Sequence, residues 1–359
     1  MPIVSDLLLG DVHAGVEMLV SRGIEHDVRE GTRPRLSLTD RDLDILEALC
    51  ELRYLTTAML AVLAWGRYNT RLRERLRLLF RAGLVRRFRP PSPPSGGRHQ
   101  WIYELDVKGH RLLRDRREDA APSWAPSELY SLSYAEHDLE LNALLCEIAA
   151  RAAAHVGQDG PLWRAAPFRI QGPRSGRVDP DLERSPADAD PRNEMAPGSF
   201  VDPGSSVAGV IEPDATLTGS HAVSGEPIAV LIEYDRTRRA TKLAGKLDRY
   251  DHFLADGWRR SRYAALPYEP GVLFVSREES HIENVLREAD RRLGASIVHQ
   301  GERTRRHFPG REEIAVTSRG RLLAGDDTIM QVTPDPAARA SAVEQQLPLA
   351  RLFAARRDR

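Results

Sequence analysis

Cysteine, lysine and long apolar runs are all scarce in this sequence of 359 residues. The two cysteines, Cys50 and Cys146, lie in helical apolar patterns and form no CxxC pair, which argues against a disulfide framework and predicts a reducing, cytoplasmic setting. No segment approaches the about 18 apolar residues that a membrane helix needs, so we expect no membrane partner. The first residues carry Asp6 and Asp11 and lack a basic region, which is not typical of a signal peptide.

Two common catalytic signatures are also missing. The sequence has no GxxxxGK[ST] phosphate loop, which excludes a P-loop motor. It has no HxH or HxxxH pair, which argues against a metal centre built on two neighbouring histidines. A function that depends on either signature is therefore not expected.

Positive charge is unevenly distributed although the formal net charge is zero, with 52 basic and 52 acidic residues. Residues 67–89 contain nine arginines and a single acid, Glu74. Lysine occurs only three times, as Lys108, Lys242 and Lys246. The charge of the whole chain gives no indication of nucleic-acid binding, whereas the local arginine density favours it.

Apolar periodicity predicts three helices before residue 84. The first opens at Ser37, where Ser and Thr caps precede acidic residues. The second ends at Gly66, and the third starts at or just after Asn69 and stops at Gly83. The apolar positions of these helices recur at helical spacing and are expected to be buried: Leu43, Leu46, Leu49, Cys50, Leu60, Leu63, Leu72, Leu76, Leu79 and Phe80.

Strands are expected at 84–89 and 100–105, joined by a loop rich in proline, serine and glycine. The order of two helices, a basic helix and a basic hairpin predicts a winged-helix domain over residues 36–118, with its third helix in the major groove of double-stranded DNA. The alternative is a winged helix that contacts protein, with solvated arginines. The candidate DNA-binding residues are Asn69, Thr70, Arg71, Arg73, Arg77, Arg81, Arg86, Arg87, Arg98 and His99.

The remaining chain is expected to form an α/β (mixed α+β) domain. Composition predicts an N-terminal arm, a linker, this domain with a disordered insertion, and a flexible C-terminal tail: 1–35, 119–132, 133–325 with 171–209 inserted, and 326–359. The domain should contain a long helix at 134–154, strands at 162–170 and 211–218, and the PIAVLIEYDR strand. A buried strand at 271–276 and a helix at 281–293 follow.

Three carboxylates and two lysines suggest chemistry in this domain. Asp214 lies in one strand, Glu233 and Asp235 end the next, and Lys242 and Lys246 lie one turn apart on the following helix. Restriction-type endonucleases place an Asp in one strand and Glu-x-Lys in the next, where the carboxylates hold Mg²⁺ and the Lys orients water.

Here Asp235 stands where that lysine belongs. Either Lys242 or Lys246 supplies the amine from the helix, or Asp235 is a third metal ligand. Alternatively the carboxylates only form ion pairs with Arg236, Arg238 or Lys242. The candidate catalytic set is Asp214, Glu233, Asp235 and Lys242, with Asp214 and Glu233 as Mg²⁺ ligands and no other cofactor expected.

The long helix begins with a polar segment, AEHDLELN at 135–142. Glu136 or Glu140 could add a further carboxylate to the site. His137 and Asp138 are more typical of a cap or a packing contact than of an acid/base pair.

Several motifs together resemble the bacterial replication-relaxation family. They are LTDRDLDILEAL, RYLTTAMLAVL, RLRLLFRAGLVRR, WIYELDVKGHRLL, AEHDLELN, EPDATL and IEYDRTRRATKLAGKLDRY. The resemblance spans about residues 36–280 and implies a plasmid or integrative-element protein that acts on DNA, with replication or transfer proteins as partners. It implies no catalytic residues.

The preferred interpretation is a DNA-binding protein of mobile-element replication or relaxation, with a nuclease-like C-terminal domain that is either active or inactive. One alternative is a Mg²⁺-dependent nicking endonuclease that uses the Asp214 and Glu233 site. Another is a transcriptional regulator whose C-terminal domain dimerises or binds a partner. Winged-helix proteins often form homodimers, although no long heptad pattern indicates one here.

Overall fold

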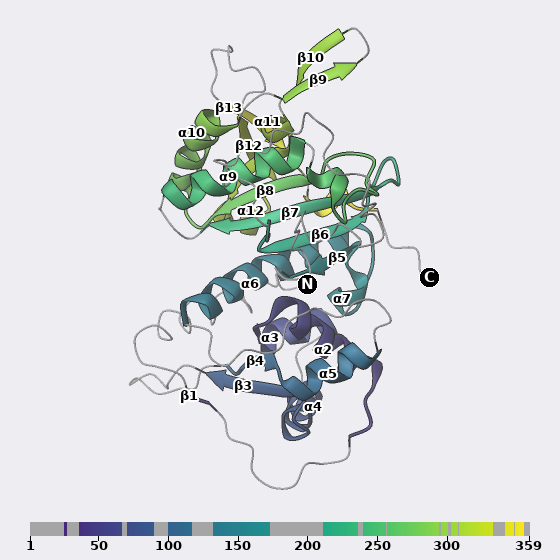
Figure 1. Ribbon diagram of the computed structural model, residues 1–359. Helices are drawn as coiled ribbons and strands as arrows, with labels where there is room; N and C mark the ends of the chain where they lie inside the picture. The colour runs from purple at the N-terminus through teal and green to yellow at the C-terminus, as the bar shows by residue number, and fades with distance from the viewer. Residues whose placement is uncertain are drawn as a thin grey trace, which may run out of the picture. The chain divides into compact units, whose positions relative to one another are not determined.

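The computed structural model describes most of the chain between residues 36 and 354 (Figure 1). The described residues are 25–26, 36–66, 70–89, 100–116, 132–172, 211–235, 240–255, 257–293, 296–300, 303–307, 309–332, 342–347 and 349–354. They form two compact units. The first comprises Met1–Ser175, Gly219–Gly225 and Leu349–Arg359, and the second comprises Gly176–Thr218 and Glu226–Pro348.

The first unit begins with helices that the sequence predicts. Its elements up to residue 116 are β1 (Glu25–His26), α2 (Asp40–Leu52), β2 (Leu55–Thr56), α3 (Thr57–Leu60), the π-helical turn η1 (Ala61–Trp65), α4 (Thr70–Arg81), β3 (Val85–Arg89), β4 (Ile102–Leu105) and α5 (Val107–Arg116). Thr39 caps α2 in a capping box with Asp42. Gly66 ends η1 in the left-handed conformation, with a φ of 82°.

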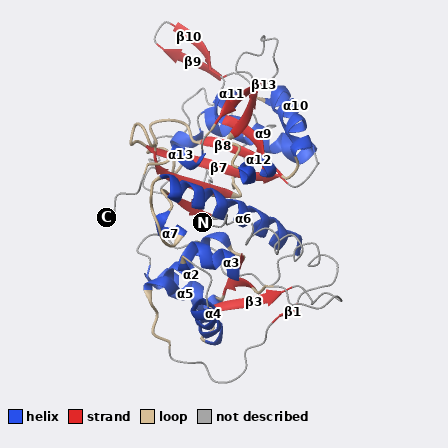
Figure 2. Cartoon of the chain, turned by 180° about the vertical axis from the view of Figure 1, so that it is seen from behind, coloured by secondary structure: helices blue, strands red, loops and turns tan. Residues whose placement is uncertain are grey.

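A small antiparallel sheet supports these helices, with the strand order β1-β3-β4-β2. Figure 2 shows α2, α3 and α4 grouped with β3. Nine of the ten apolar positions that the periodicity assigns to the core are buried, and the tenth, Leu43, is half-buried. At Gly109, a Cβ atom would lie 2.2 Å from the Leu84 carbonyl oxygen, so α5 approaches the backbone just before β3 more closely than any side chain allows.

The first unit also contains α6 (Leu132–His155), α7 (Leu162–Ala165), β5 (Phe168–Gln171) and α13 (Leu349–Leu352). The prediction of a strand at 162–170 is therefore wrong in its first half, where residues 162–165 form α7. The Pro161 carbonyl accepts hydrogen bonds from the Arg164 and Ala165 amides, which closes a helical turn before the strand begins.

In the second unit, strands lie in the order β13-β12-β11-β8-β7-β6. Their bounds are β6 (Ala215–Ser220), β7 (Pro227–Asp235), β8 (Gly271–Ser276), β11 (Ile314–Ser318), β12 (Thr328–Val332) and β13 (Ala342–Gln346). The central strands β7, β8 and β11 are parallel, whereas β12 and β13 continue the sheet antiparallel. The helices are α9 (Ala240–Ala255), η2 (Gly257–Arg260), η3 (Glu279–His281), α10 (Ile282–Arg292), α11 (Pro309–Glu313) and α12 (Arg319–Ala324).

Helices α9 and α10 cover one face of this sheet (Figure 1). Leu247 and Phe253 of α9 join one buried cluster with Leu231, Phe274 and Val316 from the three parallel strands. The alternate residues of β7 therefore point toward α9, and Glu233, two residues after Leu231, does so as well. Glu233 therefore lies between β7 and α9, where the candidate site is located.

The structure differs from the sequence-based expectation near the C-terminus. Residues from 326 on were expected to form a flexible tail, but β12 and β13 pair with each other, Met330 opposite Glu344, and β12 joins the sheet. Another hairpin, β9 (Ser296–Gln300) with β10 (Arg303–His307), forms a separate two-stranded sheet that the sequence did not indicate. The α/β class is confirmed. None of the described helices is long and apolar enough to cross a membrane.

The expected linker (119–132) and insertion (171–209) lie almost entirely outside the described residues. Only Leu132 of the first and Gln171 and Gly172 of the second are described, and they belong to α6 and to β5 and its end. The N-terminal arm is likewise outside, apart from β1.

Candidate functional site

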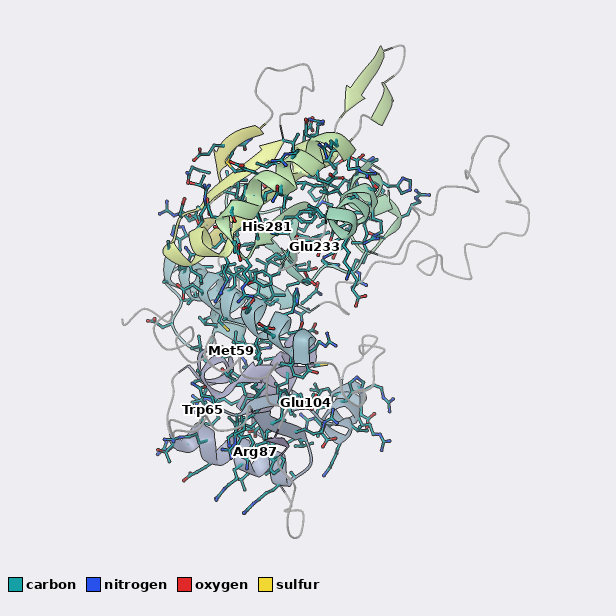
Figure 3. The ribbon with its side chains drawn as sticks, turned by 90° about the vertical axis from the view of Figure 1, so that its left-hand side faces the viewer. Met59, Trp65, Arg87, Glu104, Glu233 and His281 are labelled. Atoms are coloured by element: carbon teal, nitrogen blue, oxygen red, sulfur yellow. The ribbon has the colours of Figure 1, made fainter. Side chains whose placement is uncertain are left out.

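Glu233 is the centre of a polar cluster in the second unit. Its side chain comes from β7 toward α9 and is buried, with 2% of the residue exposed (Figure 3). The Tyr250 hydroxyl donates a hydrogen bond of 2.7 Å to Glu233 Oε1, and the Lys246 ammonium donates to Oε2. Because Lys246 and Tyr250 are four residues apart on α9, both lie on the face that covers Glu233.

Asp214 lies beside this pair. Its Oδ2 accepts a 2.8 Å hydrogen bond from the Tyr234 amide, and the same oxygen is 3.9 Å from Lys246 Nζ. Asp214 was expected within a strand but lies one residue before β6, and its carboxylate shares the Lys246 ammonium with Glu233 of β7. The sequence motifs PDA, EYD and KLDRY converge here, and each contributes at least one contact.

The two lysines of α9 have different surroundings. Lys242 is exposed, and it is Lys246 that reaches both carboxylates. The tentative assignment of the amine to Lys242 is thus replaced by Lys246. Asp235 is half-buried at the end of β7, where its backbone carbonyl accepts from the Arg277 amide.

The pKa values within the cluster follow from burial and from mutual charge. Burial raises the pKa of Glu233 to about 7, against the lowering effect of the Lys246 ammonium. Burial acts to lower the pKa of Lys246, but the Glu233 and Asp214 carboxylates outweigh it, so that pKa is raised. Burial and the neighbouring Glu233 raise the pKa of Tyr250 well above its usual value.

This donor set does not fit a divalent cation in the arrangement observed. Both oxygens of Glu233 accept hydrogen bonds from α9, and an ammonium group lies between Glu233 and Asp214. Within the described part of the chain, no three His, Cys, Asp or Glu side chains are grouped to hold a metal ion. Mg²⁺ requires several oxygen ligands around one point, which these residues do not provide.

The polar start of α6 has a packing role in the first unit. Asn142 Nδ2 donates 2.8 Å hydrogen bonds to the carbonyls of Leu52 and Tyr54, at the end of α2. Asp138 forms an ion pair of 3.2 Å with Arg53 and contacts His137. Arg53 has a positive φ of 62°, and these contacts hold the α2–β2 turn in that conformation. Glu136 and Glu140 are buried in the same helix.

The third predicted feature is the arginine face of α4, where Arg73, Arg77 and Arg81 follow one another at successive turns. We include in this name Arg71, which lies on the adjoining exposed side of the same helix. All four residues are exposed, as is Thr70 at the start of the helix. Leu72, Leu76, Leu79 and Phe80 are buried on the opposite side. Asn69, Arg98 and His99, which belong to the same candidate set, lie outside the described residues.

Arg75 is the arginine of α4 that turns inward. Its Nε donates a 2.6 Å hydrogen bond to Asp42 Oδ1, and its NH2 group donates to Oδ2 and to the Ser37 carbonyl. The Arg75 guanidinium and the Thr39 hydrogen bonds lower the pKa of Asp42, against the opposing effect of burial. This bidentate pair fixes α4 to the start of α2.

The candidate arginines of β3 also have defined neighbours. Arg86 Nε is 3.1 Å from Glu104 Oε1 across the β3–β4 pair. The Arg87 guanidinium carbon lies 4.5 Å from the ring centroids of both Phe80 and Trp101. Sequence reasoning gave Trp101 no part in the site, because a single tryptophan next to a strand is usually a core residue.

Comparison with known protein families gives one result. The family model described as Replication-relaxation matches residues 46–267. The chain belongs to the replication-relaxation family. A search of the curated proteins and of the solved structures found no match.

The matched region contains α4, Asp214, Glu233 and the Lys246–Tyr250 segment. Family membership confirms the resemblance seen in the sequence motifs. It indicates a role in the replication or relaxation of plasmids or other mobile elements.

Proposed function

We propose that this replication-relaxation protein binds double-stranded DNA through a winged helix built from α2, α3, α4, β3 and β4. The observation that carries the proposal is the arginine face of α4, with four exposed guanidinium groups along one 12-residue helix. A helix of that width fits the major groove, and arginine is the side chain best suited to phosphate and guanine.

The support for α4 makes this face rigid. The buried leucines hold its rotation, and the Arg75–Asp42 pair holds its N-terminal half against α2. A cationic ridge that is fixed before binding loses less conformational entropy when it meets DNA. Glu74 is the one acid in α4, so the exposed surface of the helix keeps a positive charge.

The proposal is tested by the affinity of the full chain for a fluorescent duplex. Arg73→Gln/Arg77→Gln removes two charges of the arginine face and should weaken binding by roughly five-fold for each lost phosphate contact near 0.15 M salt. Arg114→Gln is the matched control, since it removes an exposed arginine from α5.

Equal affinities for the wild type and the double variant would contradict the proposal. So would a loss in the Arg114→Gln control that is half as large on a logarithmic scale, because that control removes one charge against two and binding would then depend only on total charge. Absence of any DNA binding by the wild-type chain would favour a winged helix that contacts protein.

We further propose that the cluster around Glu233 is structural and that the domain does not cleave DNA. The supporting observation is the Lys246 ammonium, which lies against both carboxylates that a nuclease would use for Mg²⁺. Supercoiled plasmid incubated with the protein and Mg²⁺ should remain supercoiled. Nicking that is lost in Glu233→Gln would establish the endonuclease alternative instead.

A further inference from the structure

Two arginines of β3 share one tryptophan at the base of the β3–β4 loop. Arg87 and Arg89 are two residues apart on the strand, so both point to the same face. The guanidinium carbons lie 4.5 Å (Arg87) and 4.4 Å (Arg89) from the Trp101 ring centroid. The Arg87 guanidinium carbon also lies 4.5 Å from the ring centroid of Phe80, the last buried residue of α4.

Stacking of this kind orients a guanidinium group without using its donors. The ring contacts the flat face of the guanidinium, whereas a phosphate binds the N–H groups in its plane. Arg87, Arg89 and Trp101 are all partly exposed, so solvent reaches this stack. Two like charges gathered on one indole also repel each other, and a bound anion relieves that repulsion.

We propose that Trp101 is a positioning residue that holds Arg87 and Arg89 for a phosphate group of the DNA backbone. This contact rests on the proposed DNA binding and is separate from the arginine face of α4. It lies where the strands enter the loop, and Phe80 links it to the end of α4.

The neighbouring contacts rank the arginines of β3. Arg86 faces Glu104, whose carboxylate offsets its charge, so Arg86 should contribute less to phosphate binding than Arg87. Arg87 lies 4.5 Å from two ring centroids, those of Phe80 and Trp101, and is therefore the arginine of β3 that aromatic contacts orient most.

The test is a double-variant cycle on the affinity of the full chain for a labelled duplex. Trp101→Ala should weaken binding about five-fold, and Trp101→Phe should restore most of it, because a ring remains under the guanidinium groups. Arg87→Gln/Arg89→Gln should weaken binding and lower the salt slope by about one to two. In that background, Trp101→Ala should cause no further loss of affinity.

A further five-fold loss in the Arg87→Gln/Arg89→Gln background would overturn the inference, since Trp101 would then act through general stability. Circular dichroism of each variant separates unfolding from lost binding. If Arg73→Gln/Arg77→Gln weakens binding while the β3 variants bind like the wild type, the inference fails and the proposed function stands. If the wild-type chain does not bind the duplex, the proposed function itself fails.

Discussion

The two groups of basic side chains in this protein have opposite surroundings. On α4, four arginines are exposed along one face. In the second unit, Lys246 lies against Glu233 and Asp214, and its charge is balanced inside the fold. Exposed, oriented cations are available to a polyanion, whereas a neutralised ammonium stabilises the domain that contains it. This difference supports the proposed DNA binding by α4 and the proposed structural role of the Glu233 cluster.

The largest effect is expected at Glu233. Glu233→Ala removes the acceptor of both Lys246 and Tyr250 and leaves a cavity under α9, which should lower the free energy of unfolding by about 3 kcal/mol. Urea denaturation of the full chain measures this effect. A variant as stable as the wild type would show that the cluster does not support the fold.

The pH dependence of the free energy of unfolding tests the Glu233 cluster further. The folded-state pKa of Glu233 is about 7 and its ordinary value is 4.5, so the folded chain holds a proton that the unfolded chain has released. Binding of this proton by Glu233 stabilises the folded chain at low pH, and the stabilisation is lost as the pH rises from about 4.5 to 7. Lys246→Met removes the charge that lowers this pKa, so its destabilisation should be larger at pH 8 than at pH 5, by about 1–2 kcal/mol.

Unfolding free energies at pH 5, 6.5 and 8 check this prediction. The control is Glu233→Gln/Lys246→Met, which has no titrating group at the centre of the cluster and should show no comparable change over that range. If Lys246→Met destabilised the chain equally from pH 5 to pH 8, the proposed interaction between the Lys246 ammonium and the Glu233 carboxylate would be contradicted.

Two arginines of α4, Arg75 and Arg77, test the proposed binding surface of the first unit. Arg75→Gln leaves the buried Asp42 carboxylate without its ion pair and should cost about 2 kcal/mol of stability. Arg77→Gln, two residues later and exposed, should change stability by less than about 0.5 kcal/mol while weakening DNA binding. If Arg77→Gln destabilised the fold and Arg75→Gln weakened DNA binding instead, then Arg75 rather than Arg77 would lie on the binding surface, and the account of α4 would be wrong.

The helices of the first unit could be predicted because each carries a regular apolar stripe. Leu72, Leu76, Leu79 and Phe80 are buried at 3.6-residue spacing, and that spacing alone places the arginines on the other face. The inward turn of Arg75 could not be predicted, since it depends on Asp42, 33 residues away.

The Glu233 cluster was only partly predictable. Asp214, Glu233 and the lysines were recognisable as polar residues at strand ends and on one helix. The choice between Lys242 and Lys246 depends on how α9 is rotated against the sheet, which tertiary packing decides. Tyr250 was missed because a tyrosine in an apolar helix pattern is usually a core residue. Strands β12 and β13 were missed because their pairing depends on backbone groups that any composition provides.

The salt dependence of duplex binding tests the central claim most directly. The logarithm of the association constant is measured against the logarithm of salt concentration for the wild-type chain and for Arg73→Gln/Arg77→Gln. If the arginine face of α4 binds phosphates, the slope should become shallower by about two in the double variant, since each lost contact removes about 0.9. Superimposable slopes would contradict the account.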